Sequence, residues 1–205
     1  MYKTWGEIRK ETLALGFEKV KAYEKNKQSY IDAYNWAVNY LNNTVSPVTD
    51  IIKLDIDYEA TSGEYDLDRL TATEDKTTVF SGVYDVLNSD NRRINYRVKN
   101  RNILIIPSSY DGEEITVIYK KYVPKLTSAD SDTFVCPLEY RYTDLVPYLM
   151  ANRLYLDDDR SKAGYYWNLF DDMKNRLQDA EMTRRVNVVI INDDYTKGRW
   201  SEWER

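Results

Sequence analysis

Two groups of acidic residues are the side chains of this sequence best placed to do chemistry. Asp157, Asp158 and Asp159 stand in a row, and alternating acids run from Asp55 to Asp68. Carboxylate oxygens can bind a divalent cation, and a pair of carboxylates can hydrolyse a glycosidic bond. Adjacent aspartates cannot all face one ion, however, and acids that alternate with Ile and Tyr are typical of a strand with one solvated face. We therefore expect no catalytic, cofactor-binding or metal site in either group.

Other catalytic side chains are scarce. The sequence contains no histidine, which removes the most common general base and the most common zinc ligand. Cys136 is the only cysteine; it lies in the apolar stretch FVCPLEY, so we expect a small buried side chain rather than a nucleophile. The sequence has no glycine-rich phosphate loop, GxSxG or CxxC motif. No class of enzyme is favoured.

A local basic patch stands out against the overall charge. Arg92, Arg93, Arg97 and Arg101, with Lys99, surround Tyr96. Basic and aromatic residues together can grip single-stranded nucleic acid, but the net charge of −5 and the pI near 5.0 argue against a protein that neutralises phosphates. A solvated hairpin or a contact with an acidic protein is the favoured interpretation of this patch.

Composition indicates a globular chain that uses aromatic residues heavily. The 205 residues include 19 Tyr and 5 Trp, side chains that combine an apolar face with a polar group and suit surfaces that bind a partner. No apolar stretch is long enough to cross a membrane, and the N-terminus MYKTWGEIRKE does not resemble a signal peptide. We expect no membrane contact.

Two helices are predicted at the N-terminal end. Thr4 and Glu7 have the spacing of a capping box, and Gly16 is placed to end that first helix. The second helix is expected to begin after Asn26 or Lys27. Its buried stripe has helical spacing and consists of Tyr30, Ala33, Tyr34, Ala37, Val38 and Leu41.

The middle of the chain changes character after Pro47. Short β-branched and aromatic runs, bounded by Gly, Asn, Asp and Ser, predict strands from about residue 46 to residue 126. Asp111-Gly112 is a strong turn dipeptide. We expect one antiparallel sheet of about five strands.

Two more helices are predicted after residue 130. Asp144 is expected to cap the first, with Pro147 in its first turn, where a missing N–H is tolerated. The second begins after Asp159, and the acids before it complement the helix dipole. Its stripe consists of Ala163, Tyr166, Trp167, Phe170, Met173, Leu177 and Ala180.

These elements predict an α+β fold. Residues 1–45 and 127–185 are expected to form a four-helix core from two N-terminal and two C-terminal helices. Residues 46–126 form a β-rich insertion, and residues 186–205 form an extended C-terminal arm.

The stretch from Phe134 to Leu177 resembles the C-terminal part of the head-to-tail adaptor (connector) proteins of tailed bacteriophages. These proteins have a Pro-containing entry before Glu-Tyr, a helix, an acid-rich corner, a Lys-Ala step and an aromatic helix. The matching residues here are Pro137, Glu139, Tyr140, Ala151, Leu154, Asp157, Asp159, Lys162, Ala163 and Phe170.

The resemblance implies a virion structural protein of the head-tail joint, assembled in the host cytoplasm. Copies of the chain would form a ring, usually of about twelve subunits, beneath the portal protein. The ring would extend the DNA channel without binding DNA specifically, and the next tail or stopper protein would dock on it. Many such proteins grip the portal with a C-terminal arm, which here would use Tyr195, Arg199, Trp200 and Trp203 as anchors. A strand at Val188–Ile191 could also add to a foreign sheet.

Three alternatives stay open. The chain could be a stopper or tail-completion protein of the same joint. It could be a binding module with an aromatic surface for a carbohydrate or protein ligand. A hydrolase that uses two carboxylates between Asp55 and Asp68 is the third.

Overall fold

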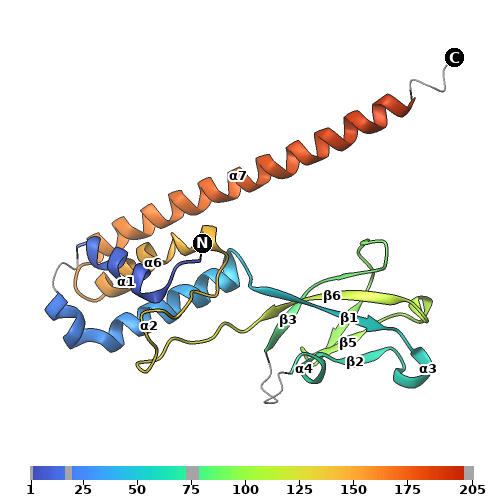
Figure 1. Ribbon diagram of the computed structural model, residues 1–205, viewed down its shortest axis with the longest axis horizontal. Helices are drawn as coiled ribbons and strands as arrows, with labels where there is room; N and C mark the ends of the chain where they lie inside the picture. The colour runs from blue at the N-terminus through green and yellow to red at the C-terminus, as the bar shows by residue number, and fades with distance from the viewer. Residues whose placement is uncertain (1, 17–19, 73–78, 201–205) are drawn as a thin grey trace. The chain divides into compact units, whose positions relative to one another are not determined.

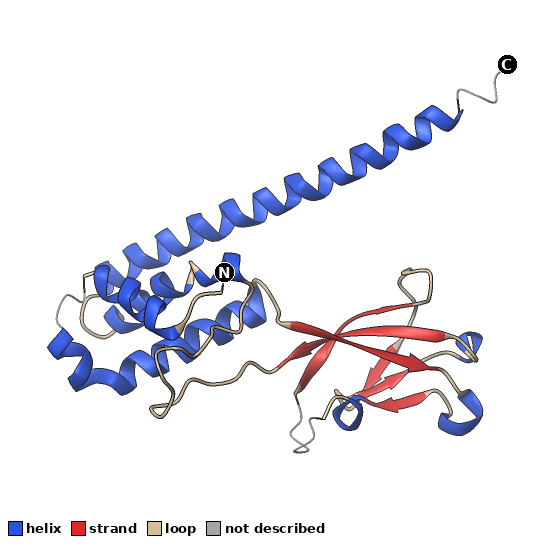
Figure 2. Ribbon diagram, viewed as in Figure 1, coloured by secondary structure: helices blue, strands red, loops and turns tan. Residues whose placement is uncertain are grey.

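The chain divides into a mainly helical unit and a unit that contains all the strands (Figures 1 and 2). The computed structural model describes residues 2–16, 20–72 and 79–200, with the backbone alone at residues 20–22, 24–25 and 181–200. The helical unit comprises Met1–Ala37, Leu126–Cys136 and Tyr140–Arg205, and the β unit comprises Val38–Lys125 and Pro137–Glu139. The fold class is α+β, as predicted.

The helical unit contains α1 (Trp5–Ala14), the larger part of α2 (Val20–Thr44), α5 (Tyr140–Thr143), α6 (Val146–Tyr155) and α7 (Arg160–Trp200). The predicted capping box starts α1: the Glu7 N–H donates to Thr4 Oγ1 at 3.4 Å, and the Thr4 N–H donates to Glu7 Oε2 at 2.8 Å. Gly16, with a φ of +118°, follows the end of this helix as expected.

Helix α2 begins earlier than predicted and is kinked. Asn26 has a non-helical φ of −120°, so the predicted start near this residue is the start of the second piece. The predicted stripe is confirmed, since all six of its residues are buried: Tyr30, Ala33, Tyr34, Ala37, Val38 and Leu41.

Aromatic contacts join α1 to α2 in the core of the helical unit. Trp5 meets Tyr34 edge to face, with ring centroids 5.2 Å apart, and Phe134 approaches the same tyrosine at 6.4 Å. Deeper in the unit, the Thr12 hydroxyl of α1 lies 3.6 Å from the Met150 sulfur of α6.

The start of α6 differs from the prediction. Leu145 occupies the N-cap position without a side-chain cap, whereas the Asp144 carboxylate pairs with Lys3 Nζ at 2.6 Å. Pro147 lies in the first turn, as expected. Asp144 therefore forms an ion pair with Lys3, which is distant in sequence, instead of capping the helix as its position predicted.

Helix α7 is much longer than predicted: residues 186–200, expected to belong to an extended arm, are helical, and residues 201–205 of that arm lie outside the described residues. The backbone is helical through Trp200. Residues 160–200 contain no proline, and β-branched residues such as those of VNVVII lower helix propensity only slightly. Ion pairs one turn apart support the same helix, for example Arg176 with Asp172 at 2.7 Å.

The β unit contains β1 (Thr49–Asp55), α3 (Tyr58–Thr61), β2 (Glu64–Asp66), α4 (Leu67–Leu70), β3 (Phe80–Leu87), β4 (Arg97–Lys99), β5 (Ile103–Ile105), the 3-10 helix η1 (Ser108–Tyr110) and β6 (Glu114–Lys121). The strands form two three-stranded antiparallel sheets, in the orders β1-β6-β3 and β2-β5-β4. The expected single sheet of about five strands is wrong.

The chain leaves one sheet for the other directly after β5. Pro107 cannot donate to a ladder, and η1 follows it. The predicted turn at Asp111-Gly112 exists, with φ of +76° at Gly112, but it connects the sheets instead of forming a hairpin. The tight hairpin lies between β4 and β5, where both Asn100 and Arg101 have positive φ.

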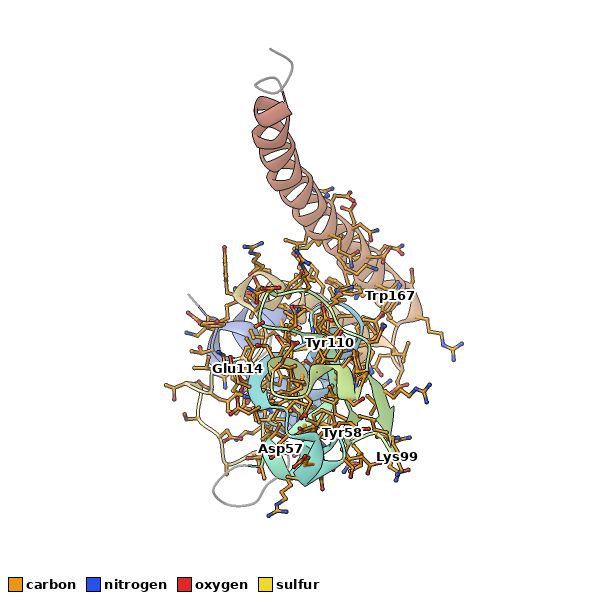
Figure 3. The ribbon with its side chains drawn as sticks, turned by 90° about the vertical axis from the view of Figure 1, so that its right-hand side faces the viewer. Asp57, Tyr58, Lys99, Tyr110, Glu114 and Trp167 are labelled. Carbon is orange, nitrogen blue, oxygen red and sulfur yellow. The ribbon has the colours of Figure 1, made fainter. Side chains whose placement is uncertain are left out.

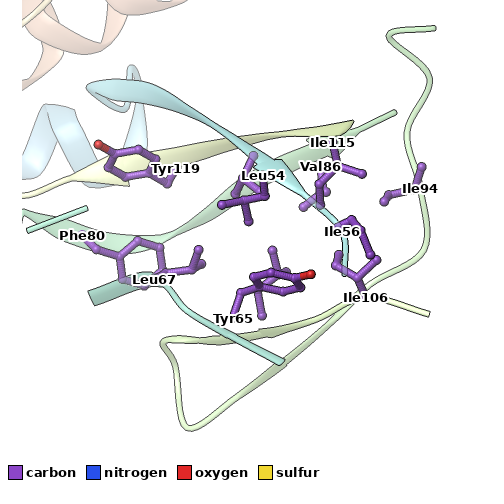
Figure 4. Packing of buried hydrophobic residues seen from close by; sticks show 12 residues of the cluster. Leu54, Ile56, Tyr65, Leu67, Phe80, Val86, Ile94, Ile106, Ile115 and Tyr119 are labelled. Carbon is purple, nitrogen blue, oxygen red and sulfur yellow. The ribbon is translucent and has the colours of Figure 1, made fainter. Parts of the chain in front are cut away.

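A single apolar cluster holds the two sheets of the β unit together (Figure 4). It consists of Leu54, Ile56, Tyr65, Leu67, Phe80, Val86, Ile94, Leu104, Ile106, Ile115, Val117 and Tyr119. Because both sheets supply members, neither three-stranded sheet has to be stable alone.

Candidate partner-binding surfaces

The acidic corner between α6 and α7 is a structural joint. Asp159 Oδ1 accepts from the N–H groups of Ser161 and Lys162, each at 3.1 Å, so this aspartate caps α7, which begins directly after the acidic run as predicted. Asn152 Nδ2 donates to the Ala163 carbonyl at 2.9 Å, across the corner. The carboxylate at the end of the acidic run therefore serves the backbone.

Aromatic side chains fix the same corner to the end of α1. Tyr155 and Tyr166 stack with centroids 5.7 Å apart and planes inclined by 7°. The Tyr155 hydroxyl donates to the Gly16 carbonyl at 3.3 Å, and the Tyr166 hydroxyl donates to the Leu15 carbonyl. Lys162 Nζ lies 5.1 Å from the centre of the Tyr155 ring.

An open cleft of about 510 Å³ lies beside this corner, at the kink of α2. It is lined by Asn26, Ser29, Tyr30, Asp32, Ala33, Arg153, Leu154, Asp157 and Asp158. Arg153 lies 5.9 Å from the centre of the Trp36 ring, so its guanidinium is already in contact with an aromatic face. The lining is mostly polar and carries both signs of charge.

The sequence suggested that the acids between Asp55 and Asp68 form one solvated strand face. This prediction is wrong. Asp57 and Asp66 cap the short helices α3 and α4, where they accept backbone N–H groups. Asn102 Nδ2 bridges Asp66 and Asp68 at 3.3 and 2.9 Å. Figure 3 labels Asp57 next to Tyr58 at the start of α3. Several of these acidic residues therefore stabilise turns and helix starts.

The basic patch is divided between two places. Arg92 and Arg93 follow β3, where Arg93 Nε contacts Asp85 Oδ2 at 2.7 Å. Arg97 lies on β4 and Arg101 at the tip of the β4–β5 hairpin, and both side chains are exposed. Lys99 reaches Glu64 at 3.3 Å.

The predicted C-terminal anchors lie near or beyond the last residue that the structure describes, Trp200. Tyr195, Arg199 and Trp200 belong to α7 by their backbone, and Trp203 lies outside the described residues. Val188–Ile191 is helical rather than a strand.

Cys136 is buried, as predicted. Its thiol faces Tyr34, and burial first, then this neighbour, raises the pKa of the Tyr34 hydroxyl far above its usual range. The Tyr34 hydroxyl is therefore neutral at physiological pH.

The sequence did not predict one charged contact of the helical unit. Arg9 forms a two-pronged pair with Asp132, with N–O distances of 2.8 and 2.7 Å, and its guanidinium lies over the Tyr23 ring. The two residues are far apart in sequence, so no spacing pattern could have found this pair.

Among the side chains described within residues 2–16, 20–72 and 79–200, which leave out those of residues 20–22, 24–25 and 181–200, no three of His, Cys, Asp or Glu come together in a group that could hold a metal ion. None of the helices in these ranges has an apolar stretch of the length needed to cross a bilayer. A scan against models of known protein families finds no match to this chain, and a search of curated proteins finds none either.

Proposed function

We propose that the chain is a virion structural protein of the head-tail joint of a tailed bacteriophage, without catalytic activity. In this role, copies of the chain form a ring beneath the portal. The ring extends the DNA channel and receives the next tail component. The four-helix core expected from the sequence would be its scaffold.

The helix–corner–helix of α6 and α7 is the observation that carries this proposal. The residues that resemble the adaptor proteins are used there to build a joint: Asp159 caps α7, Lys162 contacts Tyr155, and Ala163 and Phe170 are buried. A motif whose side chains support the backbone suits a structural subunit.

The C-terminal residues supply the proposed grip on the portal. Tyr195, Arg199, Trp200 and Trp203 are of the types most enriched as anchors of protein interfaces. In the proposed role, the C-terminal residues bury these side chains on a neighbouring protein.

Mixing the purified chain with the portal protein of the same virus tests the proposal. We expect electron microscopy to show a ring of about twelve copies added to the portal. The double substitution Trp200→Ala and Trp203→Ala should weaken this binding about tenfold or more, as expected for interface anchors. The matched control is Tyr165→Ala, which removes an exposed aromatic residue of α7 outside the predicted anchor set. A chain that never binds the portal would contradict the proposal.

The exposed tyrosines of the β unit favour a second candidate, a carbohydrate-binding module. Tyr84 and Tyr122 are 51% and 64% exposed, and aromatic faces of this kind can stack on sugar rings. Saturable binding of a glycan by the purified chain, lost in a Tyr84→Ala variant, would support this candidate over the first.

A further inference from the structure

Backbone hydrogen bonds show which residues of the edge strand β1 face its neighbour β6. The Lys121 N–H donates to the Val48 carbonyl at 2.8 Å, and the Ile56 N–H donates to the Glu113 carbonyl at 2.9 Å. Bonded and non-bonded pairs alternate along an antiparallel ladder. Even-numbered residues of this stretch therefore bond to β6, and the odd-numbered residues of β1 direct their N–H and C=O groups away from the sheet.

The opposite edge of the same sheet, β3, is closed. It contains two register shifts, which interrupt a straight edge. The Val86 N–H donates to Asp85 Oδ1 at 3.0 Å, and the Val86 carbonyl accepts from the Ile94 N–H at 3.0 Å. An added strand would meet backbone groups that are already occupied.

The β1 edge has no register shift and is open over a short, defined length. At the N-terminal end of the open stretch, the Ile51 N–H donates to Asp50 Oδ1 at 2.9 Å. At its C-terminal end, the Asp57 N–H donates to Tyr65 Oη at 3.1 Å. Between these positions, the outward backbone groups of Lys53 and Asp55 have no partner among the described residues.

We propose that β1 of a second copy of this chain pairs with β1 antiparallel about a two-fold axis, with Lys53 of each copy opposite Asp55 of the other. Opposed residues of neighbouring strands point to the same face, so odd-numbered residues must face odd-numbered ones. This register gives the outward N–H and C=O groups of both residues a partner in both copies. A shift by two residues in either direction places Lys53 or Asp55 opposite itself.

Side-chain chemistry favours the same register. Lys53 and Asp55 have opposite charges and pair twice across the axis, and opposite charges on facing strands stabilise a sheet. Lys53 Nζ already lies 2.7 Å from Glu114, so the lysine would sit between two carboxylates. On the inner face, Leu54 would meet its own copy at the axis. The result is one six-stranded sheet across two copies.

This contact does not rest on the proposed function. A two-fold contact closes after two copies, so it differs from the contact between neighbours that would form a ring. A protein that fails to bind a portal would still pair through β1.

Sedimentation equilibrium of the purified chain up to about 1 mM, a limit that includes weak association, tests the pairing. We expect the 24.3-kDa chain to associate reversibly into dimers. Lys53→Glu alone and Asp55→Lys alone should each weaken dimerisation about tenfold, because each creates two pairs of like charges. The double variant K53E/D55K restores the complementary charges and should dimerise within about threefold of the unchanged chain.

Rescue by the double variant separates pairing from loss of folding, because it contains both substitutions. Lys125→Glu makes the same charge change at an exposed position of the β unit and should leave the dimerisation constant unchanged. A chain that stays monomeric at 1 mM, or single and double variants that associate equally, would overturn the pairing.

Discussion

The helical unit and the β unit fix the chain by different means where regular structure ends. In the helical unit, side chains make the connections: Thr4 with Glu7, Arg9 with Asp132, and Asp159 with the start of α7. In the β unit, Asp57 and Asp66 also cap short helices, but at most of its turns the backbone itself bends into the left-handed region. All positive φ values of the described residues except that of Gly16 occur there, at Ser62, Gly63, Asn91, Asn100, Arg101 and Gly112. The helical unit should therefore be sensitive to side-chain substitution at its joints, and the β unit to added backbone constraint.

Gly63 should give the largest effect. It has a φ of +73°, and a Cβ atom there would lie 2.5 Å from the Ile106 carbonyl oxygen and 2.6 Å from the Tyr58 ring. Gly63→Ala should lower the free energy of unfolding of the β unit by about 2 to 5 kcal/mol, from left-handed strain and overpacking together. Urea denaturation, followed by hydrogen exchange resolved by segment, would measure this change in the free energy of unfolding of the β unit.

Gly82→Ala is the matched control, because nothing lies within 4 Å of a Cβ atom at Gly82. An equal loss of stability in both variants would mean that the close approach at Gly63 is not what fixes this turn.

Arg9→Ala tests the side-chain mechanism of the helical unit and should come second. The substitution leaves Asp132 without its two hydrogen bonds and Tyr23 without a cation on its ring. Hydrogen bonds to charged groups contribute about 1.5 to 3 kcal/mol each when well buried, but the Asp132 side chain is exposed, so we expect a total loss of about 1 to 2 kcal/mol. Lys10→Ala, on the exposed face of the same helix, should cost less than about 0.5 kcal/mol. Similar midpoints of thermal unfolding for the two variants would contradict this prediction.

The two mechanisms also explain what the sequence could and could not predict. A capping box has fixed local spacing, so Thr4 and Glu7 were predicted, whereas Asp159 was predicted only as one of the acids that precede the helix. A solvated hairpin was one of the two favoured interpretations of the basic patch, and the β4–β5 hairpin lies there, although Asn100 and Arg101, not glycine, occupy its left-handed positions. Asp111-Gly112 was the more obvious turn, yet Pro107 ends the ladder before it, so the dipeptide connects two sheets.

Partners distant in sequence were the other source of error. Asp144 was assigned to a helix cap from spacing alone, but Lys3 takes its carboxylate. The edge of β1 could not be foreseen either. The length of its open stretch is set by Asp50 and Tyr65, whose side chains accept the Ile51 and Asp57 N–H groups at the two ends of that stretch.

Thr4→Ala should have a smaller effect than Arg9→Ala. It removes the side-chain acceptor of the Glu7 N–H at the start of α1, and loss of an N-cap of this type costs about 1 kcal/mol. Thr4→Ser keeps the oxygen and should retain most of that stability. Chemical denaturation of both variants measures the difference; a serine variant as unstable as the alanine variant would show that the methyl group matters, not the cap.

Acid titration should give the smallest effect and compares one carboxylate from each unit. In the β unit, the Lys121 ammonium and then the Ile51 N–H hold the pKa of Asp50 below its ordinary value of 3.8. In the helical unit, the Thr127 hydroxyl and N–H likewise lower the pKa of Asp130. A lowered folded pKa gives stability that is fully present above the ordinary value and is lost as the pH falls through the folded value.

Each asparagine variant should therefore change the acid response of its own unit. Asp50→Asn should flatten the decline in stability of the β unit below the ordinary pKa of 3.8, and Asp130→Asn should do the same in the helical unit. The midpoint of urea unfolding of each unit, followed by segment-resolved hydrogen exchange at a series of falling pH values, would measure this decline. Asp50→Asn keeps an oxygen that can accept the Ile51 N–H, so the β1 edge should stay open over the same length and dimerisation above the ordinary pKa should not change. An acid response that Asp50→Asn leaves intact would mean that another carboxylate of the β unit dominates, and that the contact of Asp50 with Lys121 adds little to the sheet.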